Sequence, residues 1–388
     1  DLNVKAVPPG MINAHTPLYS SLALGMRPPE KPPANFVGIL EEIWWKLDRA
    51  LDEESNHASF EAGMTACLRA GVTTVFDHHS SQEWIGGSLE MSAAVAEEFG
   101  INLSPAFEIT DRNGRKGFEA GLEENIDFLS GNADNHHIKP LLGMHASFTL
   151  SDESLRIIAE RIKDSGAGIH IHAAEDAFDQ EDAERRGYRS VIGRLNKFGL
   201  LNENSIVVHG LYFDEEDHRI LEQTKTMLVH CPTSNANNRV GIIGSSAVAK
   251  VRAGLGTDGM QANMLKEAKE GSFIRSSHLS GGETGIDYLR LLFKHNPDLA
   301  SRIFRRKIGH IAPGCQADLA IYDYRERSAL NKSNYGGHLL FGLGKPSDVI
   351  SRGKFRIMGG EFVDLNEKRI RANSVKQSKR LWQKMQEK

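Results

Sequence analysis

Short apolar runs alternate with amphipathic segments along the first 260 or so residues of the chain. The apolar runs are short and rich in strand-forming residues, which predicts buried strands. Between them, apolar residues recur at helical spacing, as in Leu155, Ile158 and Ile162, which follow the potential helix cap Ser151. The predicted strands cover residues 10–15, 72–77, 101–109, 137–145, 168–173, 205–209, 226–230 and 253–258. The predicted helical segments cover residues 36–69, which is long enough for more than one helix, 89–99, 117–129, 151–163, 181–198, 215–224 and 245–251.

Eight strands that alternate with helices predict parallel pairing and an α/β fold. Their number, and the typical barrel length of about 250 residues, indicate a (β/α)8 TIM barrel over residues 9–304. A doubly wound open sheet is the alternative. Polar residues follow nearly every predicted strand, which favours the barrel, because barrel enzymes build their sites from many strand ends. An open sheet would concentrate its site near one switch point.

The pattern changes after Ser301. Short strand-like runs at 317–322, 348–350 and 354–363 are separated by Gly and Pro turns. We expect residues 1–8 and 305–388 to form a small β-rich composite domain, a β-sandwich appendage to the barrel. Residues 374–388 carry mixed charge at amphipathic spacing and predict a terminal helix on the solvated surface.

Composition excludes several classes of function. The 388 residues are 40% hydrophobic and 25% charged, which is typical of a soluble globular protein. The formal net charge of −4 gives no reason to expect binding to nucleic acid or to anionic membranes. No apolar run reaches the roughly 18 residues of a membrane span, and the first residues do not resemble a signal peptide. The three cysteines, Cys67, Cys231 and Cys315, are far apart, so we expect a reducing, cytoplasmic location. With nucleic acid and membrane excluded as partners, we expect a small-molecule substrate.

The chain contains 16 histidines, and several of them follow predicted strands. His15, His172 and Asp258 would leave the first, fifth and eighth strands as ligands for one divalent metal, with zinc favoured and iron or manganese possible. The metal would lower the pKa of bound water to about 7 and generate hydroxide. Glu175 follows His172 by three residues and could shuttle the proton to a leaving nitrogen. His209 could orient the hydroxide or polarise the substrate, and Asp258 could also accept a proton from the attacking water.

Each of these residues also has a structural interpretation. A single histidine in a chain of this size is more often a hydrogen-bonded structural residue, as we expect for His136, His218, His295 and His310. Asp77 or Asp258 alone could cap a helix, and His230 could have either role. Independent structural residues would rarely all fall at strand exits. We therefore predict that His172, Glu175, His209 and Asp258 act together.

The order of these motifs resembles the amidohydrolase superfamily, in its cytosine deaminase and chlorohydrolase branch. The opening motif corresponds to Pro9-Gly10 followed by His15, and the motif His-x-x-Glu to His172 and Glu175. The later motifs correspond to Val208-His209-Gly210, Ser234-Asn-Ala-Asn-Asn238 and the Gly-Thr-Asp-Gly sequence of residues 256–259. The resemblance covers almost the whole chain and implies one metal in a (β/α)8 barrel.

Within this branch, the sequence is most similar to the aminohydrolases associated with selenium metabolism, the SsnA type. Residues 44–49, 76–79, 85–89, 110–114 and 172–176 carry this resemblance. Deaminases of methylthioadenosine and S-adenosylhomocysteine are a near alternative. By similarity, His145 would contact the substrate, with His79 and Arg112 as weaker candidates for the same wall, and the protein would form a homodimer.

Pro17 is the main departure from the family pattern, because it occupies the position of the second histidine of His-x-His. Proline cannot bind a metal, although a strand end tolerates it. Three protein ligands and a water still make a workable zinc site, and His209 could move in as a ligand. A second departure is that only eight residues precede Pro9, so the β-sandwich could be incomplete.

These observations leave two hypotheses. The first is a metal-dependent amidohydrolase that deaminates a nitrogen heterocycle or cyclic amidine, with dehalogenation or amide hydrolysis as alternative reactions. The second is a catalytically degenerate barrel that binds a ligand and has lost its metal through Pro17.

Overall fold

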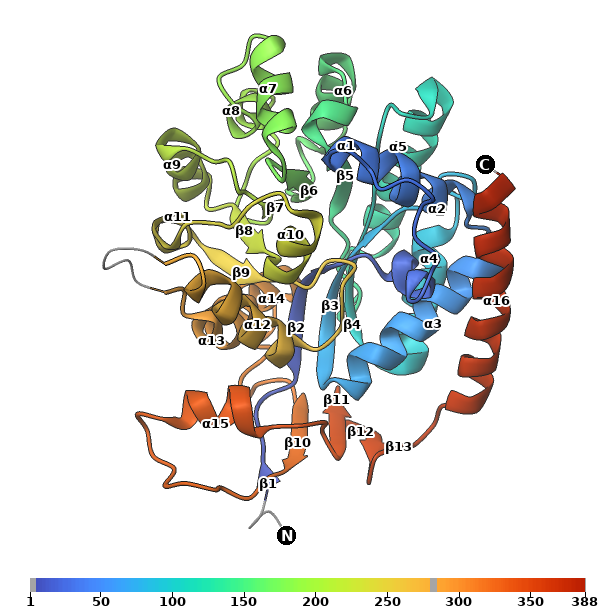
Figure 1. The fold of residues 1–388 in the computed structure, drawn as a ribbon. Coiled ribbons are helices and arrows are strands. Elements are labelled where there is room, and N and C mark those ends of the chain that lie inside the picture. Colours follow the sequence, from blue (N-terminus) through green and yellow to red (C-terminus); the bar gives the residue numbers. More distant parts are fainter. Residues whose placement is uncertain (1–4, 280–284, 388) are drawn as a thin grey trace.

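The computed structural model describes residues 5–279 and 285–387 (Figure 1). Eight strands run in parallel through the middle of the molecule, and each of them overlaps one of the eight predicted strands. They form two hydrogen-bonded ladders, β2-β3-β4 and β5-β6-β7-β8-β9. Their bounds are β2 (Met11–Thr16), β3 (Val72–His79), β4 (Asn102–Phe107), β5 (Leu142–Ala146), β6 (Ile169–Ala173), β7 (Ile206–His209), β8 (Met227–His230) and β9 (Ala253–Leu255).

Backbone hydrogen bonds join the two ladders between β4 and β5. The N–H of Leu103 donates to the carbonyl of His137 over 2.9 Å, near the start of both segments. Near their ends, the N–H of Ile109 donates to Gly143 over 3.2 Å, and the N–H of His145 donates to Ile109 over 3.0 Å. The pairing is therefore continuous across this junction, although it is irregular.

The side chain of Asn296 closes the other gap, between β9 and β2. Its Nδ2 donates to the carbonyls of Ile12 and Leu255, each over 2.8 Å, and its Oδ1 accepts from the N–H of Leu255 over 2.9 Å. Further along, the N–H of Thr257 donates to the carbonyl of His15 over 3.0 Å. The buried side-chain amide of Asn296 therefore takes the place of backbone hydrogen bonds between β9 and β2. The eight strands close into a ring, and the predicted (β/α)8 barrel is confirmed.

Helices surround the strands on the outside (Figure 1). The segment 36–69 divides into several helices, as expected, and a capping box at Asp52 begins the longest of them. The single helix predicted over 181–198 is wrong, because the chain turns at Gly187 (φ 84°) and Ser190 caps a second helix. The barrel helices are α1 (Phe36–Ile39), α2 (Trp45–Ala50), α3 (Glu53–Arg69), α4 (Ser88–Phe99), α5 (Gly114–Gly131), α6 (Asp152–Ile162), α7 (Ala177–Arg185), α8 (Val191–Lys197), α9 (Glu215–Thr224), α10 (Pro232–Asn238), α11 (Ser245–Lys250), α12 (Met264–Ser276), α13 (Tyr288–Arg290) and α14 (Asn296–Phe304). The 3₁₀ helices are η1 (Leu18–Ala23) and η3 (Ser147–Thr149), and the π-helices are η2 (Leu40–Trp44) and η4 (Leu291–His295).

A five-stranded antiparallel sheet lies below the barrel (Figure 1). Its order is β1-β10-β11-β12-β13, so the N-terminal strand pairs with the C-terminal segment. In it, Ser351 Oγ donates to the carbonyl of Gly100 at the end of α4 over 2.6 Å, which ties the sheet to the barrel. The bounds are β1 (Lys5–Ala6), β10 (Leu319–Asp323), β11 (Asp348–Ser351), β12 (Lys354–Met358) and β13 (Glu361–Phe362), with α15 (Tyr335–Gly342) between β10 and β11. The division into domains at residues 8 and 305 stays a prediction, and residues 1–4 lie outside the described residues.

The C-terminal helix α16 (Glu367–Glu387) packs along α3 and α2 (Figure 1). It begins seven residues before the predicted start at 374. Ile370 and Leu381 are buried, and Trp382 Nε1 donates to the carbonyl of Leu22 over 2.9 Å. The predicted amphipathic helix at the protein surface is therefore confirmed, and its apolar face packs on α3 and α2. Residue 388 lies outside the described residues.

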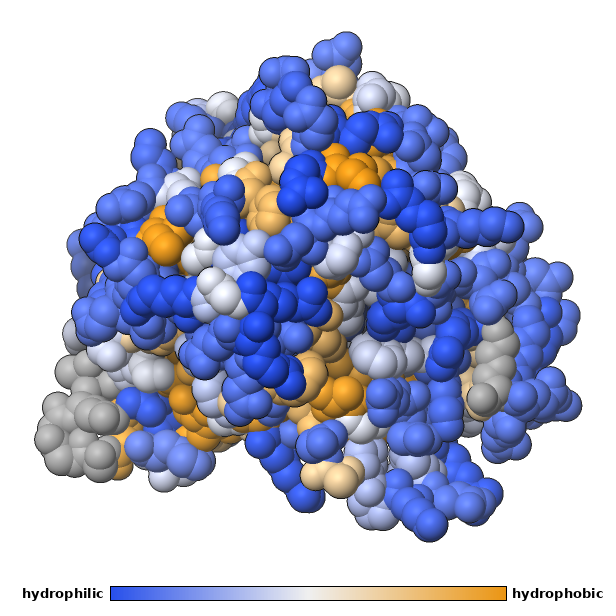
Figure 2. Space-filling model, turned by 90° about the horizontal axis from the view of Figure 1, so that it is seen from above, coloured by the Kyte–Doolittle hydropathy of each residue, from blue (hydrophilic) through white to orange (hydrophobic). Residues whose placement is uncertain are grey.

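The face of the molecule seen from above is largely hydrophilic, with small hydrophobic areas between the polar side chains (Figure 2). None of the helices in the described part of the chain combines the length and apolarity needed to cross a bilayer.

Candidate active site

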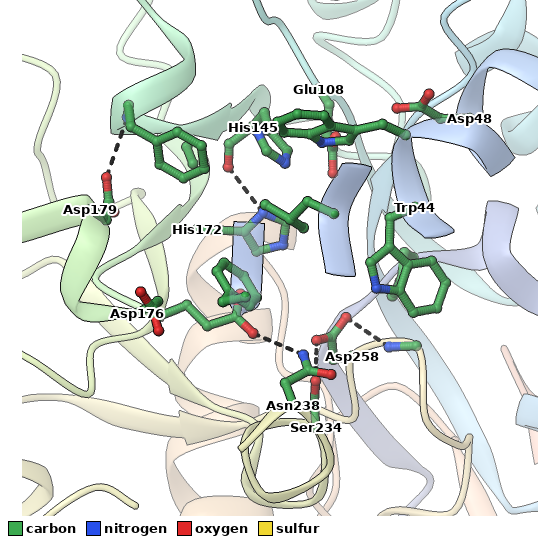
Figure 3. Close-up of a pocket in the computed structure, with 18 of the residues that line it drawn as sticks. Trp44, Asp48, Glu108, His145, His172, Asp176, Asp179, Ser234, Asn238 and Asp258 are labelled. Carbon is green, nitrogen blue, oxygen red and sulfur yellow. Dashed lines mark hydrogen bonds between the residues drawn. The ribbon is translucent and has the colours of Figure 1, made fainter. Parts of the chain in front are cut away.

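A cavity opens where the barrel strands end at their carboxyl termini (Figure 3). Its floor contains His172 from the end of β6 and Asp258 from the loop after β9. Glu175 and Asp176 line it from the segment between β6 and α7. This is the end of a TIM barrel at which active sites are built.

Three histidines converge beneath this cavity. Ligand atoms of His15, His172 and His209 lie within 4.8 Å of one another, although the residues come from β2, β6 and β7. Behind the cluster, His172 Nδ1 donates to the carbonyl of His145 over 3.0 Å, and His209 Nδ1 donates to Asn235 Oδ1 over 2.8 Å. In a neutral imidazole, a proton on Nδ1 means that Nε2 carries none, and a ring nitrogen without a proton can bind a metal.

The Nε2 atoms of His15 and His209 are buried and have no hydrogen-bond partner among the described residues. Burial lowers the pKa of His15 to about 4, and it lowers the pKa of His172 well below the usual value. Neutral imidazoles with unused buried nitrogens are costly unless something occupies the space between them. The described residues therefore fit a divalent metal ion.

Asp258 lies beside the histidine cluster. Its Oδ1 is 3.7 Å from His15 Nε2, and its Oδ2 accepts a hydrogen bond from Ser234 Oγ over 2.5 Å. Burial alone would raise the pKa of Asp258, but its contacts with the rings of His15 and His209 and the hydrogen bond from Ser234 outweigh burial and lower the pKa. Asp258 is therefore a carboxylate that can act as a fourth ligand or accept a proton.

Glu175 reaches the same cluster from the other side. Its Oε2 lies 3.3 Å from His209 Nε2, and its Oε1 accepts from Asn238 Nδ2 over 3.1 Å. Burial raises the pKa of Glu175 to about 7. A carboxyl group with this pKa can both take up and release a proton near neutral pH.

The backbone is strained at three strand exits around the site. Ala174, His209 and Asp258 have φ values of 50°, 78° and 51°, in the left-handed region that favours glycine. Such strain persists where the surrounding structure holds it, and it is common at functional sites. Here it turns the chain after β6, β7 and β9.

Pro17 lines the cavity at the position of the motif's second histidine. Its ring lies against Gly259, since a Cβ placed at Gly259 would be 3.7 Å from Pro17 Cγ. An apolar ring therefore fills the position of one possible ligand. His209 belongs to the histidine cluster as well as to a second possible ligand group with Glu175 and Asp258.

His78 and Glu108 form a third possible ligand group with His172. However, His78 Nδ1 is 3.0 Å from Glu108 Oε1, and its Nε2 faces the carbonyls of Met144 and His170. Burial alone would lower the pKa of His78, but the hydrogen bond and charge of Glu108 outweigh burial and raise it. All of these partners are acceptors, so both ring nitrogens carry protons and His78 cannot bind a metal.

The three predicted substrate contacts are placed differently. His145 lines the cavity and donates or accepts at Thr149 Oγ1 over 3.0 Å. Arg112 lies one layer behind the cavity, where it pairs with Asp48 over 2.8 Å and its Cζ is 4.6 Å from the ring centre of Trp45. His79 points away from the cavity, with its ring centre 5.0 Å from Phe60 and 5.7 Å from Phe107. The structure therefore does not bring His79 to the predicted substrate wall, because successive side chains of β3 face opposite sides.

Sequence reasoning assigned no role to the aromatic wall of the cavity. Trp44 and Trp45 line one side of it, and Phe148 and Phe178 line another, with ring centres 5.4 Å apart. The tryptophans had been singled out only as part of a family resemblance. They lie on the helical segment between β2 and α3, away from any strand exit, so the strand pattern gave no signal for them.

The profile of the amidohydrolase family matches residues 6–355 of the chain. The 5-methylthioadenosine/S-adenosylhomocysteine deaminase of Pyrococcus furiosus is 26% identical over 381 residues, which are 95% of this chain and 88% of that protein. The 8-oxoguanine deaminase of Pseudomonas aeruginosa is 26% identical over 392 residues, covering 94% and 85% of the two chains.

Solved structures share the fold. An adenosine deaminase from Xanthomonas campestris with bound zinc superposes with a TM-score of 0.85 at 21% identity, covering 97% of this chain and 86% of the other. The zinc complex of atrazine chlorohydrolase from Arthrobacter aurescens gives a TM-score of 0.81 at 17% identity, covering 97% and 88%. The predicted resemblance is confirmed at the level of the family, while the SsnA type stays a prediction. With a profile match over most of its length and the histidine cluster at the barrel mouth, the chain belongs to the amidohydrolase family.

Proposed function

We propose that this protein is a metal-dependent aminohydrolase that removes an amino group from a planar nitrogen heterocycle, with zinc as its single metal. The observation that carries the proposal is that ligand atoms of His15, His172 and His209 lie within 4.8 Å of one another, while Glu175, His209 and Asp258 form an overlapping group of the same kind. Iron and manganese accept the same donor set and are distinguished by metal analysis.

A bound zinc ion supplies Lewis-acid activation of water at neutral pH. Glu175 takes the proton that the attacking water gives up and passes it to the nitrogen that leaves as ammonia. Its raised pKa, about 7, suits both steps. Asp258, held by Ser234, is a second acceptor for a water proton. His209 would hold the metal through Nε2, since its Nδ1 is already bonded to Asn235.

The class of substrate is supported by the cavity and by the relatives. Planar rings stack on aromatic side chains, and Trp44, Trp45, Phe148 and Phe178 line the cavity. Relatives over almost the whole chain are named for deamination of 5-methylthioadenosine and 8-oxoguanine, both of which contain a purine. The chlorohydrolase among the structural neighbours supports the fold alone, so dehalogenation is an outcome of the test.

The test starts with metal content after zinc, iron or manganese has been supplied separately. We expect about one metal per chain and ammonia release from at least one compound in a panel of purines, pyrimidines, pterins and triazines. Chloride release from a chlorotriazine without ammonia release would favour the chlorohydrolase. Metal far below one per chain under all three conditions would favour the degenerate ligand-binding barrel instead.

A variant isolates the proton step. Glu175→Gln should keep the metal and lose turnover by about 100-fold or more, because an amide cannot shuttle the proton. The exposed Glu160→Gln is the matched control and should keep both. Full activity of Glu175→Gln would contradict the assignment.

We also expect a homodimer that works in the cytoplasm. All three cysteines are unpaired, and Cys67 and Cys231 are buried, as suits a reducing compartment. Sedimentation analysis of the purified protein tests the dimer.

A further inference from the structure

The described lining of the cavity contains no lysine or arginine. Six of its lining residues carry carboxyl groups, namely Asp48, Glu108, Glu175, Asp176, Asp179 and Asp258.

Two arginines contact the aromatic wall from outside, and each has a carboxylate partner. Arg112 lies over Trp45 and pairs with Asp48 over 2.8 Å. Arg185 lies 5.2 Å from the ring centre of Phe178 and is 3.7 Å from Asp182. Neither arginine belongs to the described lining, so an anion inside the cavity would find no guanidinium there.

Most of the lining carboxylates already have an ion-pair or hydrogen-bond partner, or a role in the proposed reaction. Asp48 pairs with Arg112, and Glu108 pairs with His78. Asp179 accepts from the backbone N–H of Ala174 over 2.8 Å and of Phe148 over 3.3 Å. Glu175 and Asp258 belong to the proposed reaction centre.

Asp176 is the exception. Its Oδ1 caps α7 by accepting from the N–H of Phe178 over 3.0 Å. Its Oδ2 has no hydrogen-bond partner among the described residues. Asp176 and Trp44 lie on opposite sides of the cavity (Figure 3). The cap fixes the carboxylate, so its second oxygen is a preorganised acceptor on the cavity wall.

Resting on the proposed function, we propose that the substrate is a purine whose substituent is neutral or cationic, that Asp176 accepts a hydrogen bond from that substituent, and that anionic substituents are rejected. The aromatic wall holds the ring, while an anionic substituent on the side of Asp176 meets a carboxylate and finds no lysine or arginine in the described lining to pair with. A substituent with an ammonium group gains a charge-assisted hydrogen bond at Asp176.

A matched series of compounds tests this selectivity. Adenosine, 5′-amino-5′-deoxyadenosine and adenosine 5′-monophosphate share one ring and differ in charge at one position. With zinc-loaded protein, we expect kcat/KM for the amine to equal or exceed that for adenosine, and kcat/KM for the monophosphate to be at least about 100-fold lower. Binding is followed independently through the fluorescence of the four tryptophans, of which Trp44 and Trp45 line the cavity.

The variant Asp176→Asn removes the charge and keeps a good helix cap. It should lower the ratio of kcat/KM for the amine over adenosine by at least tenfold and improve the monophosphate relative to adenosine. The control Asp214→Asn makes the same exchange at the cap of α9, where Asp214 pairs with Arg189 outside the cavity, and should leave both ratios unchanged.

The outcomes separate the two proposals. A monophosphate that reacts as well as adenosine, or an Asp176→Asn variant with unchanged ratios, overturns the selectivity while the proposed function stands. Failure of all three compounds to bind or react also overturns it, and ammonia release from a different ring would still support the aminohydrolase. No turnover of any heterocycle by fully metal-loaded protein overturns the proposed function itself.

Discussion

The Nδ1 atom of His15 lies 2.9 Å from the Nε2 atom of His170, and both rings are completely buried. For Nε2 of His15 to bind a metal, the proton of this ring must sit on Nδ1 and point at His170. The carbonyl of His170 in turn accepts from His78 Nε2 over 3.0 Å. Metal binding through Nε2 of His15 therefore requires His170 Nε2 to accept this hydrogen bond, which makes His170 a positioning residue for the ring of His15.

Replacing His170 should weaken the metal site without removing a ligand. We expect His170→Phe to lower zinc affinity by about 10–100-fold, the usual effect of losing a partner behind a metal-binding histidine. Competition with a chromogenic chelator measures this affinity directly and does not depend on turnover.

The variant His170→Gln is the control for the hydrogen bond, because a glutamine oxygen can still accept from His15 Nδ1. It should retain more of the zinc affinity than His170→Phe. Equal affinities in both variants and in the unmodified protein would show that the contact with His170 has no influence on the metal.

Asn296 should matter for stability because it closes the barrel. In Asn296→Leu, the N–H and carbonyl of Leu255 and the carbonyl of Ile12 lose this buried partner. Unpaired buried groups cost about 1–3 kcal/mol each, so the free energy of unfolding should fall by about 3 kcal/mol or more. Chemical denaturation measures it. Asn113→Leu, which loses only an exposed bond to Gln82, should change it by less than about 0.5 kcal/mol. Equal effects of the two variants would argue against this role in closure.

Glu267, on α12, should make stability depend on pH. Its carboxylate accepts from the N–H and Oγ1 of Thr233 and from Gln261, yet burial raises its pKa from 4.5 to about 7. A raised pKa in the folded state contributes stability that is complete below pH 4.5 and is lost as the pH rises to about 7. The advantage of Glu267→Gln over the unmodified protein should therefore increase across this window, by at most about 1.4 kcal/mol per pH unit. A difference in unfolding free energy that stays constant from pH 4.5 to 7 would contradict this assignment.

Local patterns were sufficient to predict the barrel and the centre of the site. Each strand is a compact apolar run, and a histidine or carboxylate at its end is placed by the barrel topology itself. This is why His15, His172, His209 and Asp258 could be brought together from sequence positions far apart. The role of Asn296 in closing the barrel could not be predicted, because it depends on how α14 returns to β2 in the folded chain.

Orientation and packing were harder to predict. The sequence pattern predicted a strand over 72–77, but β3 continues to His79. His78 and His79 are therefore successive strand residues whose side chains face opposite sides, with His78 inward and His79 outward. The apolar face of α16 packs on α3, and local spacing along the chain cannot identify this partner because the two helices are far apart in the sequence. For the same reason, nothing in the sequence pattern placed Trp44 and Trp45 over the mouth of the barrel.

Pro17 offers the most direct test of how this site compensates for a missing family histidine. Its φ of −92° is open to any residue, and its ring already lines the cavity, so Pro17→His can present an imidazole without backbone strain. If the site is short of one ligand, zinc affinity should rise by at least tenfold, as measured by chelator competition. If His209 already supplies the missing donor, the affinity should stay within a factor of about two. The double variant Pro17→His/His209→Gln then separates the cases, because it should recover zinc affinity relative to His209→Gln alone only if residue 17 can take over as a ligand. No recovery would mean that His209 and residue 17 are not interchangeable donors to the metal.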